Sequence, residues 1–89
     1  MYIRVTEKDF INMNLPLTKK QTTMLTLIRK SWLDYGYSPT RNELSIGFNS
    51  IYKIVLTRQA VDRHLFALVK KHYIIIDKKK GRRNIKIKS

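Results

Sequence analysis

The sequence TRQAVDRHLFALVKKHYIIIDKKKGRRNIKIK, residues 57–88, predicts one amphipathic helix followed by a basic β-hairpin. Thr57 can cap the helix, because a threonine hydroxyl accepts a hydrogen bond from a backbone amide of the first turn. The inward face of the helix is expected to carry apolar residues at helical spacing, Val61, Leu65, Leu68 and Val69. Lysines at its carboxyl end suit the negative end of the helix dipole.

Two strands are predicted after this helix. The first is the apolar run at residues 73–76, and the second lies at residues 84–88, where Ile85 and Ile87 alternate with lysines. This alternation gives the second strand one buried and one solvated face. The residues between the strands form a turn around Gly81.

Two further helices are predicted before residue 57. Thr18-Lys19-Lys20-Gln21 is a capping box, and it opens a helix over 19–35 that Gly36 can end. After a short extended bridge, Thr40-Arg41-Asn42-Glu43 is a second capping box and opens the next helix. That helix either ends near Gly47 or continues, in which case the apolar residues form one stripe of Leu44, Phe48, Ile51 and Val55.

The chain is expected to form one domain, residues 17–89, preceded by an extension, residues 1–16. Within the extension, residues 1–5 alternate weakly as in a short strand, and residues 6–13 resemble a short helix capped by Thr6. The order of helix, extended piece, helix, helix and hairpin is the plan of a winged helix-turn-helix domain. We therefore predict a mainly α fold with a small β-hairpin (α+β), in which a three-helix core carries a C-terminal β wing.

Composition excludes several classes of protein. The chain has 89 residues, of which 43% are hydrophobic, and it has no cysteine, so we expect one core without disulfides or thiolate metal sites. No apolar run could span a bilayer and no signal peptide is evident, which favours a cytoplasmic protein without a membrane partner. We expect no enzyme and no cofactor, because there is no paired-carboxylate motif, nucleophile elbow or phosphate-binding glycine loop.

Other conspicuous residues are expected to be structural. His64 and His72 have no nearby cysteine or carboxylate pair, so we expect no metal site. Trp32, Tyr35 and Tyr37 could stack on single-stranded bases. Their helical spacing beside leucines favours a place in the core instead.

Net charge points to a polyanionic partner. The chain carries +13, and twelve of its nineteen lysines and arginines lie after residue 50. Such a surface repels itself, and a row of phosphates relieves the repulsion while releasing condensed counterions. Nucleic acid is the interpretation we favour. The alternatives are an anionic membrane or protein surface, and a highly soluble protein with no such partner.

The outward side of the third helix carries side chains that can distinguish bases. Near its amino end these are Arg58, Gln59, Asp62 and Arg63. Arginine can bond guanine bidentately, glutamine can bond adenine, and a carboxylate can accept from cytosine. The alternative is the solvated face of an ordinary amphipathic helix.

The turn of the hairpin carries five cations, Lys78, Lys79, Lys80, Arg82 and Arg83. A wing placed against the DNA backbone or in the minor groove would give them an anionic partner. Protection of an edge strand by lysines explains only one or two of them.

At the start of the second helix, Thr40 and Arg41 are candidate phosphate contacts, although capping explains Thr40 equally well. The whole interpretation requires residues 57–63 and 78–83 to share one exposed surface.

These segments resemble the amino-terminal DNA-binding domain of the LexA repressor family over about residues 17–88. Leu17-Thr18-x-x-Gln21 is similar to the start of the family's first helix, and Pro39-Thr40-Arg41-x-Glu43 to the start of its second. Ala60-x-x-x-His64-Leu65-x-x-Leu68 is similar to its recognition helix, and Lys70-Lys71 with the isoleucine strand to its exit into the wing. The resemblance implies base contacts at Thr57, Gln59, Ala60, Asp62 and Arg63.

Three features depart from the family pattern. About five extra residues separate the second and third helices, and His72 stands where a glycine is usual. No self-cleaving or dimerising domain is expected after Ser89. The resemblance therefore implies DNA binding by a winged helix without damage-responsive self-cleavage, and it is nearest to a stand-alone regulator of phage or plasmid type.

Together these observations predict a sequence-specific double-stranded DNA-binding transcriptional regulator, repressor-like in type. Its recognition helix, about residues 57–71, would enter the major groove, and its basic wing would lie on the backbone or in the minor groove. A homodimer on paired half-sites is expected, because one module of this size binds weakly, and residues 1–14 are the candidate dimer element.

One alternative is a protein-interaction module docking on RNA polymerase or a replication complex through residues 48–56, which include Ile51, Tyr52, Ile54 and Val55. Another is an origin-binding replication initiation protein.

Overall fold

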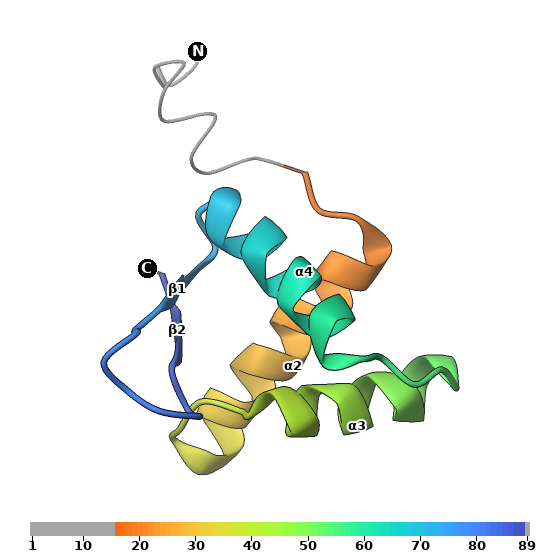
Figure 1. Ribbon diagram of the computed structural model, residues 1–89, viewed down its shortest axis with the longest axis horizontal. Coiled ribbons are helices and arrows are strands. Elements are labelled where there is room, and N and C mark those ends of the chain that lie inside the picture. The colour runs from red at the N-terminus through yellow and green to blue at the C-terminus, as the bar shows by residue number, and fades with distance from the viewer. Residues whose placement is uncertain (1–15, 89) are drawn as a thin grey trace.

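The protein folds into three helices and a two-stranded hairpin (Figure 1), as described by a computed structural model for residues 16–88. The elements are α2 (Lys19–Tyr35), α3 (Arg41–Tyr52), α4 (Arg58–Lys70), β1 (Ile74–Ile76) and β2 (Ile85–Ile87). This is the predicted winged helix-turn-helix arrangement, with the hairpin as the wing. The strand, the helix and the dimer contact expected within residues 1–14 lie outside the described residues.

Each helix begins directly after a threonine with extended backbone. The hydroxyls of Thr18, Thr40 and Thr57 accept hydrogen bonds of 3.1 Å from the amides three residues further on. Gln21 and Glu43 return a side-chain oxygen to the capping residue's amide, which completes the first two capping boxes. All three helix starts were predicted, because a cap depends on residues close in sequence.

Helix α3 passes through Gly47 and continues to Tyr52, so the longer of the two predicted helices is correct. It ends at Lys53, whose φ of 61° is left-handed. The buried residues of α3 are Leu44 and Phe48. The stripe predicted on this longer helix does not reach Val55, because α3 ends at Tyr52, and Ile51 and Val55 are 54% and 81% exposed. The last turn of α3 still contacts α2, because the Tyr52 hydroxyl lies 2.8 Å from Thr23 Oγ1 and Tyr52 packs against the core.

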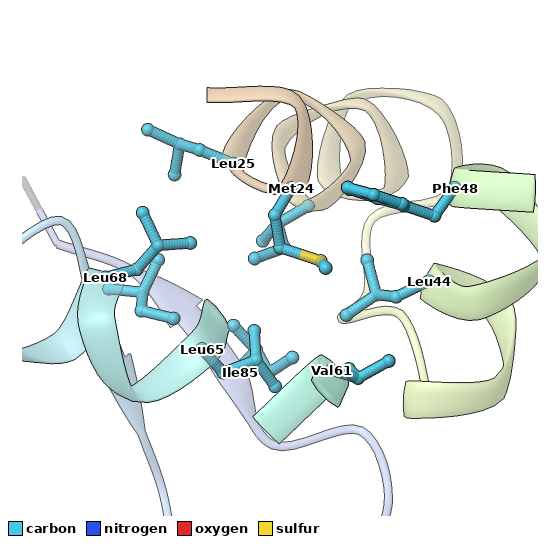
Figure 2. Close-up of a cluster of buried hydrophobic side chains, with 10 residues drawn as sticks. Met24, Leu25, Leu44, Phe48, Val61, Leu65, Leu68 and Ile85 are labelled. Carbon is cyan, nitrogen blue, oxygen red and sulfur yellow. The ribbon is translucent and has the colours of Figure 1, made fainter. Parts of the chain in front are cut away.

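The core is built from all five elements. Figure 2 shows Met24 of α2 beside Leu44 and Phe48 of α3, and Leu25 of α2 on the side of Leu68, with Leu65 of α4 and Ile85 of β2 below them. Ten apolar side chains are at most 3% exposed: Met24, Leu25, Ile28, Leu44, Phe48, Val61, Leu65, Leu68, Ile74 and Ile85. The inward face predicted for α4 is therefore confirmed, except that Val69 is only half-buried.

The hairpin is antiparallel and docks against the end of α2 and the bridge before α3. Ile74 pairs with Ile87, and Ile76 with Ile85. The amide of Ile85 donates to Ser38 Oγ at 2.9 Å, and its carbonyl accepts from Trp32 Nε1 at 3.0 Å. Both backbone groups of this buried residue are thus satisfied by side chains, which anchors β2 to α2 and to the bridge before α3.

His72 joins α4 to the hairpin in a left-handed conformation, with φ of 69°. Its amide donates to Val69 O at 3.0 Å, and the amide of Tyr73 donates to Leu68 O at 2.9 Å. Glycine is favoured at such a helix end because it adopts positive φ without a steric penalty. This geometry explains why a glycine is usual where this chain has His72.

The aromatic residues at the end of α2 do not all lie in the core. Trp32 is half-buried against it, but Tyr35 and Tyr37 are 66% and 43% exposed and stack on each other with ring centroids 5.5 Å apart. The prediction of a core position is therefore wrong for the two tyrosines. They flank Gly36, where the chain turns away from α2 into the bridge.

Candidate nucleic-acid interface

The first two turns of α4 present polar side chains opposite the buried face. Arg58, Gln59 and Arg63 are exposed, whereas Asp62 and Ala60 are half-buried. Thr57 is exposed, with its hydroxyl engaged in the helix cap. The helix therefore offers two arginines and a glutamine whose side chains are free to reach base edges.

The five cations predicted for the wing are all exposed, Lys78, Lys79, Lys80, Arg82 and Arg83. Asp77 shapes the turn that carries them. Its carboxylate accepts from the Lys79 amide at 3.0 Å, and its carbonyl accepts from the Lys80 amide at 3.1 Å. An ion pair of 3.5 Å with Lys86 holds the same carboxylate on β2. The turn thus has an ordered base, from which the lysine side chains project into solvent.

A polar hollow of about 360 Å³ brings the three groups of candidate residues together. Arg58 lines it from α4, Gly81 and Arg82 line it from the wing, and Thr40–Asn42 line it from the start of α3. The outer side of α4 and the wing therefore meet at one exposed surface. Because the first residues of α3 line this hollow and the amino end of a helix is electropositive, the hollow is suited to a phosphate group.

Arg41 lines this hollow, and its side chain contacts other residues of the protein. Its side chain is 16% exposed, Nη1 donates to Asn84 Oδ1 on the wing, and Nε lies 3.5 Å from Asp62 Oδ1 on α4. Nε is buried and makes no hydrogen bond within residues 16–88. Arg41 therefore joins the start of α3 to both the wing and α4.

Arg83 is likewise held by the protein rather than projecting from the wing. Its two terminal nitrogens each donate to Glu43 at 2.9 Å, and Nη1 also donates to Ser38 O at 2.8 Å. The guanidinium lies 4.4 Å from the centre of the Tyr37 ring, within the range of a cation–π contact. Arg82, its neighbour, has no hydrogen bond or ion pair within the described part of the chain.

Glu43 thus serves two purposes, since it closes the capping box of α3 and holds the wing. Hydrogen bonds from Arg83, and then from the Thr40 amide, lower the pKa of the Glu43 carboxyl. The same pairing raises the pKa of Arg83. Sequence reasoning found Glu43 only as a capping residue, because its partner lies 40 positions away and no local pattern links them.

His64 lies on the flank of α4 and stacks on Phe48, with ring centroids 5.7 Å apart. Burial, and then the charges of Lys20 and Arg63, lower the pKa of its imidazole. Within residues 16–88 no group of three histidines or acidic residues is placed to hold a metal ion. None of the helices described for those residues is long and apolar enough to cross a bilayer.

The family model for the LexA DNA-binding domain matches residues 14–83 of this chain. The chain belongs to the LexA DNA-binding domain family. The match covers the three helices, β1 and the basic turn, and it agrees with the resemblance seen in the sequence. No characterised protein matches the chain closely enough for a comparison.

The LexA DNA-binding domain is a regulatory DNA-binding fold, and membership of its family makes this chain a DNA-binding module. In this LexA-type domain α3 extends to Tyr52, and a turn of residues 53–57 joins it to α4. The stretch in which the sequence showed extra residues therefore forms the end of α3 and this turn. Arg58, Gln59 and Arg63 lie in the first two turns of α4.

Proposed function

We propose that this LexA-type domain is a transcriptional regulator, repressor-like and of phage or plasmid type, that binds specific sequences in double-stranded DNA. Helix α4 enters the major groove, where Gln59 and Arg63 contact base edges together with Arg58, Thr57 and Ala60. Lys78, Lys79, Lys80 and Arg82 of the wing lie on the flanking backbone or in the minor groove. Such a protein acts beside the DNA, in the cytoplasm of its cell.

The observation that carries this proposal is the hollow shared by α4, the wing and the start of α3. Arg58 and Arg82 reach it from different elements, and the Thr40 end of α3 faces it. A DNA phosphate seated there would meet two guanidinium groups and the positive end of a helix dipole. Arg41, Asp62 and Arg83 contribute indirectly, by holding the elements that make these contacts.

We propose that two copies bind paired half-sites. A single module of this size buries too little surface for tight specific binding, whereas a symmetric pair reads two half-sites about one helical turn apart. Selection of bound sequences from a random duplex pool tests both parts of the proposal. We expect a palindromic motif, and the absence of any enriched sequence would refute sequence-specific binding.

A second candidate function is docking on a protein partner. Ile51, Ile54 and Val55 are 54%, 38% and 81% exposed and gather around the turn between α3 and α4. A cluster of exposed apolar side chains is typical of a protein contact. Retention on random-sequence DNA distinguishes the two functions, because a pure docking module elutes at low salt whereas a DNA-binding protein elutes only as salt displaces phosphate contacts. An origin-binding protein would behave as the regulator does in this assay, and differs in the location of its sites.

A further inference from the structure

Asn42 lies in the first turn of α3, at a position that neither the helix cap nor the core explains. Its neighbours in the sequence are both engaged, Arg41 with α4 and the wing and Glu43 with Arg83. Asn42 itself is exposed, and within residues 16–88 its side chain makes no hydrogen bond. Its carboxamide is therefore available to a partner outside the described part of the chain.

Two adjoining hollows place Asn42 beside Arg58 of α4. Both residues line the polar hollow that also contacts Arg82 of the wing. Both also line a smaller hollow of about 200 Å³ between α3 and α4. Arg41 and Ser45 of α3 line these hollows too, but they are half-buried whereas Asn42 is exposed. Asn42 is thus the residue of α3 that combines exposure with a place next to Arg58.

The chemistry of Asn42 and Arg58 together fits a phosphate. Arg58 is exposed and has no hydrogen bond or ion pair within residues 16–88. A guanidinium beside a carboxamide offers several N–H donors and a single acceptor oxygen. Phosphate oxygens accept from both groups, and the helix before a recognition helix crosses the DNA backbone rather than entering the groove. A backbone phosphate therefore suits Asn42 better than a base edge does.

We propose that the Asn42 side-chain amide donates a hydrogen bond to a DNA phosphate, and that Arg58 contacts the same phosphate from α4. This inference rests on the DNA binding proposed above and adds a contact that the sequence did not indicate. The sequence pointed to Arg41 as the phosphate contact, but the Arg41 guanidinium is turned toward Asp62 and Asn84. The next residue along α3 makes the contact instead. Because phosphates carry no sequence information, Asn42 fixes how α3 lies on the backbone and reads no base.

Asn42→Asp tests the contact in the full chain with almost no change in side-chain shape. The substitution removes the N–H donor and places a negative charge against the phosphate. We expect affinity for duplex DNA to fall about tenfold or more on every sequence, the order expected when a hydrogen bond to a charged group is lost. Base preference should stay the same, and a changed preference would show that Asn42 contacts a base instead. An acidic residue suits the first turn of a helix, so the thermal midpoint should not fall, which separates lost binding from lost folding.

Asn49→Asp is the matched control. Asn49 is exposed on the same helix and lines neither hollow. It lies nearly two full turns after Asn42, so it shares the same helix face about 10 Å further along the axis. The two variants have equal net charge, and general repulsion from DNA is therefore the same in both. An equal loss of affinity in the two variants would show that Asn42 makes no local contact.

Uncharged linkages in the DNA locate the phosphate. Methylphosphonate replaces one phosphate at a time in the selected duplex, and affinity is measured for the parent protein, Asn42→Asp, Arg58→Gln and Asn49→Asp. We expect one phosphate in each half-site at which the replacement weakens the parent strongly but weakens Asn42→Asp and Arg58→Gln much less, because each variant has already lost part of that contact. Asn49→Asp should follow the parent at every position.

Two results of this measurement would contradict the proposal. Equal replacement effects in the parent and in Asn42→Asp at every phosphate would remove Asn42 from the interface. Reduced effects at different phosphates in Asn42→Asp and Arg58→Gln would show that the two residues do not share a phosphate.

The parent protein separates this inference from the function on which it rests. If the parent is not retained on duplex DNA even at low salt, both the proposed function and the role of Asn42 are wrong. If the parent is retained while Asn42→Asp and Asn49→Asp bind alike, only the role of Asn42 is wrong.

Discussion

Glu43 and Arg83 form a two-pronged ion pair, with both oxygen–nitrogen distances at 2.9 Å. The pair links the first turn of α3 to the root of the wing. A bidentate pair fixes direction as well as distance, because the planar guanidinium must lie in register with the carboxylate. The wing therefore leaves the domain at an angle that the start of α3 determines.

This pair should make the docking of the wing sensitive to acid. The pKa of Glu43 in the folded protein is lower than its ordinary value of 4.5, so the unfolded chain binds the proton more readily. The stabilisation is present above about pH 4.5 and is lost as the pH falls through the lowered pKa. In Arg83→Gln, carbon NMR titration should show the Glu43 carboxyl returning toward its ordinary pKa. Arg82→Gln is the control and should leave that titration unchanged.

Substitutions at the start of α4 should alter which bases are preferred. Gln59→Ala and Arg63→Ala should each weaken binding to the selected site by about 1–3 kcal/mol and relax the preference at one or two base pairs. Thr26→Ala, at an exposed position on α2, should leave both properties intact. Quantitative binding to a panel of single-base variants measures the effect. An unchanged preference profile in both α4 variants would exclude α4 as the reading helix.

Neutral substitutions in the wing should weaken binding to every sequence alike. Lys79→Gln and Arg82→Gln should each reduce the slope of log affinity against log salt by about 1, because each removes one phosphate contact. The control is Lys30→Gln on α2, whose ammonium pairs with Asp34 at 2.9 Å. If the wing variants retained the parent slope, the wing would not contact the backbone.

The two glycines at chain turns should respond differently to a methyl group. Gly36 has φ of 77°, a conformation that alanine adopts only with strain, so Gly36→Ala should destabilise the fold by about 1 kcal/mol. Gly81 has ordinary φ, and a Cβ there meets nothing within 4 Å, so Gly81→Ala should be neutral or slightly stabilising. Urea denaturation of the two variants measures the difference. Equal midpoints would contradict the assignment of Gly36 as a strained helix end.

The secondary structure was largely predictable because its signals are local. The caps at Thr18, Thr40 and Thr57 depend on residues three positions away, and the buried face of α4 follows from helical spacing. The end of α3 was less predictable. Apolar residues continue beyond Tyr52, but among the elements described for residues 16–88 none buries Ile51 and Val55.

The candidate site was predictable only in part. Arg58, Gln59, Arg63 and the wing lysines followed from helix phase and charge, and they are exposed as expected. The internal partners of Arg41 and Arg83 were not predictable, since these cations look the same in the sequence as cations that face solvent. Asn84 and Arg41 are 43 positions apart, and only the docking of the hairpin on α3 brings them together.

Arg41 has a mechanical consequence for recognition. Arg41 belongs to α3 and contacts both Asp62 of α4 and Asn84 of the wing. These contacts hold α4 and the wing in a fixed arrangement. If the protein does not adjust its shape, the duplex must bend to meet both α4 and the wing. We therefore expect flexible pyrimidine–purine steps between the two contact regions to raise affinity, although the protein does not contact those base pairs. Comparing operators that differ only at those steps would measure how much of the selectivity comes from the stiffness of the DNA.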